Sequence, residues 1–212
     1  SAFCVVMFII VPLCIYYFSY YWQLRVSGNF SVAQVVGLQK SIFDYHAGLG
    51  GDTHAFRSEW YQWPVIAWPM WYYSGSSYLP AGMVSSISCM GNPAVFWFGL
   101  AAILCVAMRC AWEKRASRAF LLVLIGFLSQ YLPWVLVPRS MYIYHYFASV
   151  PFIIMATAWW LDRLSGRTRR VVTALYLTGA LVFFVLFFPY ASGWLTSTSW
   201  LDAMKWFSKL YY

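Results

Sequence analysis

The segment from Asp44 to Tyr73 combines ionisable and aromatic side chains in a chain that has few charges. Only 9% of the 212 residues are charged, and 62% are hydrophobic. In such a sequence a polar side chain is expected to face water, a partner or a substrate path. The acids, histidines and tryptophans of this segment are Asp44, His46, Asp52, His54, Glu59, Trp60, Trp63, Trp68 and Trp71. We therefore take this segment as the first candidate for a functional site.

The spacing within this segment leaves two interpretations open. His46 and His54 are eight residues apart across a glycine turn, which is not a spacing specific for a metal ion. Asp52 and Glu59 could serve as a general acid and base, but their separation along the chain does not show that they meet. The aromatic residues, including Trp63, could instead form a belt at the level of the lipid headgroups. The histidines and Glu59 could equally be solvated loop residues.

Arg139 is the second candidate. It lies in a tight turn, Pro138 to Ser140, between two apolar segments, so we expect it to be held at the membrane surface. Tyr142 and His145 follow at i+3 and i+6, and we expect them on one face of the descending helix. A guanidinium group with a phenol and an imidazole below it suits a lipid phosphate. The alternative is an arginine that snorkels to any headgroup.

The composition predicts an integral membrane protein. Aromatic residues make up 22% of the chain and its mean hydropathy is +0.63, both outside the usual range of soluble proteins. A helix needs roughly 20 apolar residues to span a bilayer. The segments that we predict to span are 1–22, 93–108, 119–137, 141–161 and 171–189. The first lacks the basic start and cleavage site of a signal peptide, so we interpret it as a spanning helix. Because the sequence begins without a methionine and is apolar from its first residues, we expect the chain to be the C-terminal piece of something longer.

The placement of charge predicts the orientation of these spans. The net charge is +8, but eight of the fourteen basic residues fall in two short connections between spans. They are Arg109, Lys114, Arg115, Arg118, Arg163, Arg167, Arg169 and Arg170. This pattern is typical of cytoplasmic loops and differs from the exposed basic face of a nucleic-acid-binding protein. The loop 23–92 and the tail 190–212 should therefore be extracytoplasmic.

Both extracytoplasmic segments are expected to carry an amphipathic helix in the membrane interface. Ser31 and Gln34 fit a capping box that begins the first of these helices, and Gly48 should end it. Ser199 should cap the second, which places Leu201 on its apolar face. The predicted fold class is thus an all-α polytopic membrane protein with about five transmembrane helices and a long extracytoplasmic loop.

An ordered series of short motifs resembles the C-terminal membrane region of protein O-mannosyltransferases. The resemblance covers most of the chain and implies the C-terminal part of a GT-C fold. The family transfers mannose from a polyprenyl-phosphate carrier to Ser or Thr of proteins outside the cytoplasm, without a cofactor or metal. The chain looks bacterial in kind, which implies the plasma membrane. The motifs are YHAGL, THAF, SEWYQWP, PMWYY, GNPAVFW and LSQYLPWVLVPRSMYIYHYFASVPF.

The resemblance also implies roles for the two candidate groups. Arg139, with Tyr142 and His145, is expected to bind the phosphate of the lipid carrier. The loop from His46 to Trp63 is expected to line the acceptor entrance, and its named residues are His46, His54, Glu59, Trp60 and Trp63. The family's catalytic acid lies in a first external loop, in an N-terminal half that is absent here, so no catalytic residue is assigned.

The resemblance further implies a set of partners. These are membrane lipids, the polyprenyl-phosphate sugar, the acceptor protein and the N-terminal half of the same polypeptide. Three alternatives stay open. The chain could belong to a related GT-C enzyme with another sugar or acceptor, to a transporter, or to a non-catalytic membrane subunit. A transporter predicts charges along its spans, whereas the polar residues here gather at one predicted face.

Overall fold

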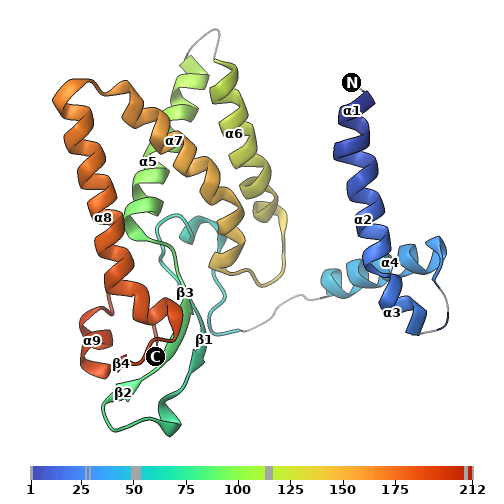
Figure 1. Cartoon of the computed structure of the whole chain (residues 1–212), viewed down its shortest axis with the longest axis horizontal. Coiled ribbons are helices and arrows are strands. Elements are labelled where there is room, and N and C mark those ends of the chain that lie inside the picture. The colour runs from blue at the N-terminus through green and yellow to red at the C-terminus, as the bar shows by residue number, and fades with distance from the viewer. Residues whose placement is uncertain are drawn as a thin grey trace. The chain divides into compact units, whose positions relative to one another are not determined.

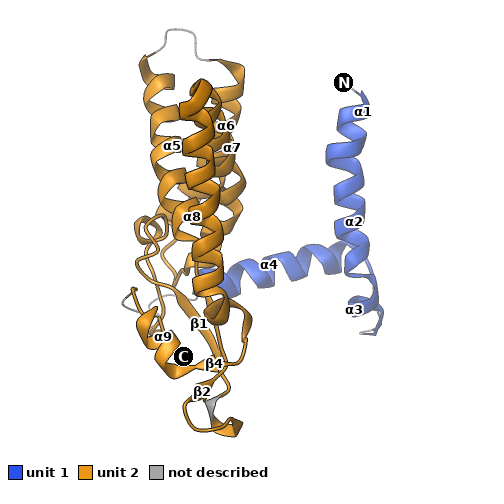
Figure 2. Cartoon of the chain, turned by 60° about the vertical axis from the view of Figure 1, so that its left-hand side comes forward, with its two compact units in different colours: residues 1–52 blue, residues 53–212 orange. Residues whose placement is uncertain are grey.

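The computed structural model of the chain describes residues 2–26, 28, 30–48, 54–112, 117–207 and 210–211 (Figure 1). It divides into two units, Ser1–Asp52 and Thr53–Tyr212, which Figure 2 colours separately. Each unit is described by itself. Asp52, which we considered as half of an acid and base pair, lies outside the described residues, as do Lys114 and Arg115.

Unit 1 begins with an apolar helix that changes type along its length. It consists of α1 (Ala2–Val5), a π-helical turn η1 (Val6–Ile10), α2 (Val11–Ser19) and α3 (Tyr21–Val26). The π-helical turn ends two residues before Pro12, which has no N–H to donate to the preceding turn. Together, Ala2–Val26 is long and apolar enough to cross a membrane.

The helix predicted after Ser31 is present in unit 1 as α4 (Val32–Gly48). Ser31 caps it, because the Ser31 Oγ accepts a hydrogen bond from the Gln34 N–H at 3.3 Å. A chain of side-chain hydrogen bonds joins α4 to α2: Tyr16 donates to Gln39 at 2.5 Å, and Tyr20 donates to Tyr16 at 3.0 Å. Polar contacts therefore fix the interface between the two helices of this unit.

Unit 2 is a helix bundle (Figures 1 and 2). Its helices are α5 (Pro93–Trp112), α6 (Arg118–Tyr131) with the 3-10 extension η4 (Leu132–Leu136), the 3-10 helix η5 (Ile143–Ser149) leading into α7 (Val150–Arg163), and α8 (Gly166–Ser192). Among the described residues, four helices are long and apolar enough to span a membrane, the three in this unit being Pro93–Trp112, Arg118–Leu136 and Gly166–Ser192.

The membrane-spanning helical fold class is confirmed, with differences in detail. The expected span 141–161 begins as the 3-10 helix η5 and continues as the 14-residue α-helix α7, so its α-helical part is shorter than α5 and α8. Pro133 lies in η4 and Pro151 in the first turn of α7, so each proline is placed where its missing N–H is tolerated. The chain is also not wholly helical, because unit 2 contains short strands.

The strands gather in the loop before α5 and in the tail. β1 (Met70–Ser74) pairs antiparallel with β3 (Ser86–Cys89), and the 3-10 turn η3 (Ser76–Tyr78) lies between them. β2 (Met83–Val84) pairs antiparallel with β4 (Thr196–Ser197), which ties the tail to the loop. The prediction of an all-α chain missed these strands. The β2–β4 pair joins segments more than 100 residues apart, which leaves no local signal in the sequence.

The tail helix α9 (Thr198–Ala203) corrects one predicted cap. We expected Ser199 to be the N-cap, but the Ser197 Oγ accepts the hydrogen bond from the Trp200 N–H, at 3.3 Å. Ser197 ends β4 in an extended conformation, which is the backbone geometry that an N-cap requires. Ser199 instead donates to the Ser197 hydroxyl at 3.1 Å.

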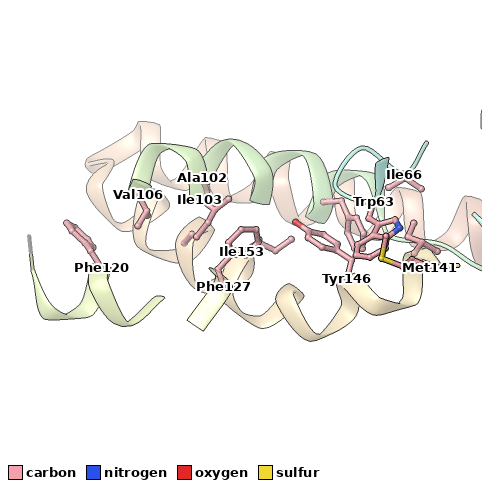
Figure 3. Packing of buried hydrophobic residues seen from close by; sticks show 13 residues of the cluster. Trp63, Ile66, Ala102, Ile103, Val106, Phe120, Phe127, Met141, Tyr146 and Ile153 are labelled. Atoms are coloured by element: carbon pink, nitrogen blue, oxygen red, sulfur yellow. The ribbon is translucent and has the colours of Figure 1, made fainter. Parts of the chain in front are cut away.

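The buried core runs along the bundle of unit 2. Figure 3 shows the cluster extending from Phe120 and Val106 at one end to Trp63 and Met141 at the other. The last turn of α5, the first turn of α6 and the connection from α7 to α8 lie together at the first end, whereas the strands lie at the second (Figure 1). The described basic residues of the two predicted connections are therefore at the same end of the bundle.

Close packing of α5 on α7 predicts a stability effect. A Cβ added at Gly99 would lie 2.9 Å from the Cβ of Ile153, which the α7 backbone holds in place. Gly99→Ala should therefore lower the free energy of unfolding by about 1–3 kcal/mol. Gly179→Ala is the matched control, because its Cβ would meet Ala94 at an ordinary 3.7 Å. Thermal unfolding of the full-length protein in detergent compares them, and equal unfolding temperatures would contradict this packing.

Candidate functional site

The ring of His145 lies among aromatic rings at the end of unit 2 that carries the strands. Its centroid is 4.1 Å from that of Trp134 and 4.4 Å from that of Tyr144. It stacks on Trp63 at 5.9 Å and on Tyr142 at 6.3 Å. We call these five residues, Trp63, Trp134, Tyr142, Tyr144 and His145, the His145 cluster. Because rings have few rotatable bonds, such a cluster holds the imidazole in one orientation.

The start of η5 sets which nitrogen of His145 can meet a ligand. The Tyr142 N–H donates to the His145 Nδ1 at 3.1 Å, and the Tyr142 carbonyl oxygen lies 2.9 Å from the same nitrogen. The backbone therefore engages Nδ1, and Nε2 is the nitrogen that could contact a bound group. Ring position and backbone contact together fix the direction in which Nε2 points.

The structure brings the two predicted groups of residues together. His54, from the loop, meets the ring of Tyr142 edge to face at 5.3 Å. Trp63, from the same loop, stacks on His145. Tyr142 and His145 come from the segment after Arg139, about 80 residues further along the chain. The loop and the turn before α7 thus form one site.

Trp63 acts as the anchor of this site. Its side chain is fully buried, and its indole Nε1–H donates to the Ser58 Oγ at 2.9 Å. The Ser58 N–H in turn donates to the Met141 carbonyl at 2.8 Å. A ring with no exposed surface positions its neighbours rather than touching an acceptor. Trp63 therefore positions His145 by stacking against its ring.

Arg139 supplies the positive charge beside the cluster. It lies between η4 and η5, is half-buried, and is close enough to Tyr144 and His145 for its charge to act on both side chains. The helical face that we predicted from Arg139 to His145 is wrong. Tyr142 is extended, with φ −145° and ψ 156°, and helix begins only at Ile143. The Tyr142 ring still lies beside those of His54 and His145.

Glu59 and Trp60 have structural partners. The Glu59 carboxylate forms a salt bridge with Arg57 at 2.9 Å, and its N–H donates to the Gln62 side chain at 2.7 Å, which closes the short helix η2 (Trp60–Gln62). The Trp60 carbonyl accepts the hydroxyl of Tyr131 at 2.9 Å. These contacts hold the loop against α6. His46 is exposed in the last turn of α4 and belongs to unit 1.

Sequence reasoning missed Trp134 and Ser58. Trp134 follows Pro133 in η4 and packs against both His145 and Trp63, the latter at 6.1 Å. The conformation of η4 brings it there, and a tryptophan in an apolar span carries no signal of such a position. Within the described residues, no three of the His, Cys, Asp and Glu side chains converge in a way that could hold a metal ion.

The strand pair β1–β3 borders the cluster through Tyr72. Burial is the main cause that raises the pKa of Tyr72 to about 12, with further contributions from Cys89 and Tyr144. Burial also raises the pKa of the Cys89 thiol to about 11, and a hydrogen bond with Tyr72 opposes this shift. Both groups are therefore neutral at physiological pH. This side of the site offers hydroxyl and thiol groups without charge.

Residues 31–210 match the family model described as the C-terminal four-transmembrane region of protein-O-mannosyltransferase. The chain belongs to the protein O-mannosyltransferase family. The loop helix α4, the His145 cluster, the bundle and most of the tail lie inside the matched range. The resemblance inferred from the sequence motifs is thus confirmed, and the site described above is a site of this family's C-terminal region.

Individual protein O-mannosyltransferases are distant in sequence. The chain is 25% identical over 193 residues to a polyprenol-phosphate-mannose–protein mannosyltransferase of Corynebacterium glutamicum, covering 84% of this chain and 37% of the relative. It is 23% identical over 210 residues to dolichyl-phosphate-mannose–protein mannosyltransferase 5 of Candida albicans, covering 87% of this chain and 29% of the relative. The chain therefore spans about a third of the length of these relatives.

A solved structure has the same fold. This is the S. cerevisiae protein O-mannosyltransferase Pmt1-Pmt2 complex bound to the sugar donor, which is similar with a TM-score of 0.69 and 22% sequence identity. The similarity covers 86% of this chain and 27% of the yeast chain. At this identity the likeness concerns the arrangement of helices, and it supports the bundle described for unit 2.

The anchor of the site can be tested through Ser58. Ser58→Ala leaves the buried indole N–H of Trp63 without its acceptor, which should cost about 1–3 kcal/mol of unfolding free energy. Ser129→Ala is the control, because Ser129 is exposed and its hydroxyl donates to the Gly126 carbonyl of its own helix, at 2.9 Å. Chemical or thermal unfolding in detergent measures both. A Ser58 variant as stable as the control would contradict the anchoring role of Trp63.

The raised pKa of Cys89 predicts slow alkylation. Only the thiolate reacts, so at pH 8 the rate for Cys89 should be at least about a hundredfold below that of a free thiol. The rate should rise with pH up to about 11, the pKa of this thiol. Iodoacetamide labelling followed by peptide mass spectrometry measures the rate, with the SDS-denatured protein as the control. Equal rates in native and denatured protein would refute the burial of this thiol.

Proposed function

We propose that the full-length protein transfers mannose from a polyprenyl-phosphate carrier to Ser or Thr hydroxyls of proteins, and that Arg139 holds the carrier phosphate. The observation that carries this proposal is the placement of Arg139 beside Tyr144 and His145, in a turn at the strand-bearing end of the bundle. A guanidinium group can donate two parallel hydrogen bonds to phosphate oxygens. Membership of the protein O-mannosyltransferase family supports the choice of reaction.

Each member of the cluster has a distinct part in this proposal. Arg139 neutralises phosphate charge, and the fixed Nε2 of His145 donates a hydrogen bond to a phosphate oxygen. Tyr142 lies between His145 and His54, so it connects the phosphate side with the loop that faces the acceptor. Positioned donors that match a leaving phosphate stabilise the negative charge that develops as the sugar departs.

The catalytic base is proposed to come from outside this chain. Two of the described acids are engaged elsewhere, Glu59 with Arg57 and Asp162 with Arg169, each at 2.9 Å. The Asp162 pair also lies at the other end of the bundle, beside the α7–α8 connection. An acid from the N-terminal part of the full-length protein would deprotonate the Ser or Thr hydroxyl, while the residues here hold the leaving phosphate.

We also infer the orientation and location of the site. The helix ends that flank both basic connections lie at the end of unit 2 opposite Trp63 of the His145 cluster, and basic residues there favour the cytoplasmic side. The site would then face the extracytoplasmic side of a bacterial plasma membrane, where acceptor proteins emerge. This placement suits a lipid carrier whose phosphate lies at headgroup depth.

Replacing Arg139 tests the donor role. In the full-length enzyme, Arg139→Ala should raise the KM for the lipid-linked mannose by about tenfold or more, because a charge-assisted hydrogen bond contributes about 1.5–3 kcal/mol. Arg139→Lys should raise the KM for the donor less, since lysine keeps the positive charge but lacks the planar guanidinium that donates two parallel hydrogen bonds. The KM for an acceptor peptide should change little. Transfer of radiolabelled mannose to the peptide provides both values.

Arg167→Ala is the matched control, because it removes one arginine from the other end of the bundle. It should leave the KM for the donor unchanged. An Arg139→Ala enzyme with normal donor KM and raised acceptor KM would assign this turn to the acceptor instead.

A further inference from the structure

A cavity of about 310 Å³ opens between α5 and α7 at the end of unit 2 that carries the basic connections. It lies at the opposite end of the bundle from the His145 cluster, so the proposed function does not use it. Its lining combines two arginines with three tryptophans. The lining residues are Cys105, Met108, Arg109, Trp112, Trp159, Trp160 and Arg163.

The two arginines of this cavity converge on one aromatic ring. The Arg163 guanidinium lies 4.6 Å from the ring centroid of Trp159, and that of Arg109 lies 5.8 Å from the same ring. Stacking on an indole holds the plane of a guanidinium against the ring. Both arginines also line the same cavity, which gives its wall two positive charges. Such a wall favours an anion, and a phosphate matches the donor geometry of a guanidinium.

The cavity continues into an apolar space along α5. A second cavity, of about 110 Å³, is lined by Phe98, Ala101, Ala102, Cys105 and Trp160. Cys105 and Trp160 line both cavities, so the two are neighbours, and we call them together the groove. It has a cationic end and an apolar end. Its apolar end lies nearer the start of α5, toward the middle of the bundle. A molecule with an anionic head and a hydrocarbon tail has the matching distribution of polarity.

We propose that this groove binds an anionic phospholipid of the surrounding membrane. Its phosphate would lie between Arg109 and Arg163, and one acyl chain would run past Trp160 toward Phe98 and Ala101. The lipid is distinct from the sugar donor, whose phosphate we assign to Arg139 at the other end of the bundle. Bound there, the lipid would hold α5 and α7 together where they meet the headgroups.

Native mass spectrometry of the full-length protein tests this site. The protein is delipidated in a neutral detergent and titrated with phosphatidylglycerol or with phosphatidylcholine. The variant is Arg109→Gln with Arg163→Gln. The control is Arg167→Gln with Arg170→Gln, which removes the same charge from the same end but leaves the cavity lining intact. Long-range attraction of anionic lipid falls equally in both, so the difference between them reports on the groove.

The groove variant should bind phosphatidylglycerol at least about tenfold more weakly than the control variant, since it loses two charge-assisted contacts. The wild-type protein should bind phosphatidylcholine more weakly than phosphatidylglycerol. Equal phosphatidylglycerol affinity in the two variants would overturn the proposal. So would a wild-type protein that binds no phosphatidylglycerol, as expected if another part of the full-length protein fills the groove.

Alkylation of Cys105 gives a second measurement that needs no variant. This half-buried thiol lies in the wall shared by the two cavities. Phosphatidylglycerol should slow its reaction with a membrane-permeant maleimide, and phosphatidylcholine should not. The rate for Cys4, which is exposed in unit 1, should be unaffected. An unchanged Cys105 rate at saturating phosphatidylglycerol would place the lipid elsewhere.

Discussion

The burial of Trp63 is the interaction on which the candidate site depends. Its ring fills the end of the bundle core and contacts Tyr131, Trp134 and His145. Full burial of so large an apolar ring is strongly favourable, and its one polar atom is satisfied by Ser58. The loop after residue 53 is therefore fixed to the turn before α7. Without this anchor, the imidazole would lose the ring that supports it.

The bundle separates two cationic sites by the thickness of a membrane. α5 has 20 residues, which gives a length of about 30 Å, close to that of the hydrocarbon core. Arg139 lies at one end, and Arg109 and Arg163 lie at the other. Each site combines guanidinium groups with aromatic rings, but only the Arg139 site includes an imidazole and a polar loop. The same elements of recognition thus serve a proposed substrate at one face and a proposed structural lipid at the other.

The sequence predicted the features that depend on local pattern. These include the apolar helices and the Ser31 cap of α4. It did not predict that the loop with His54 and the segment with His145 form one site. The helical face assumed from Arg139 was wrong because Tyr142 is extended. The contact of Trp134 with His145 and the pairing of β2 with β4 arise from packing between distant segments, for which a single sequence has no periodic signal.

Photo-crosslinking of the donor to the full-length protein tests the central assignment most directly. A polyprenyl-phosphate analogue with a photoreactive group next to the phosphate would be irradiated with the protein in membranes, and the labelled peptide would be identified by mass spectrometry. We predict labelling of the peptide that contains Arg139 and His145, and competition by unlabelled lipid-linked mannose. Labelling confined to the peptide that contains Trp159 and Arg163, or to segments outside this chain, would contradict the account.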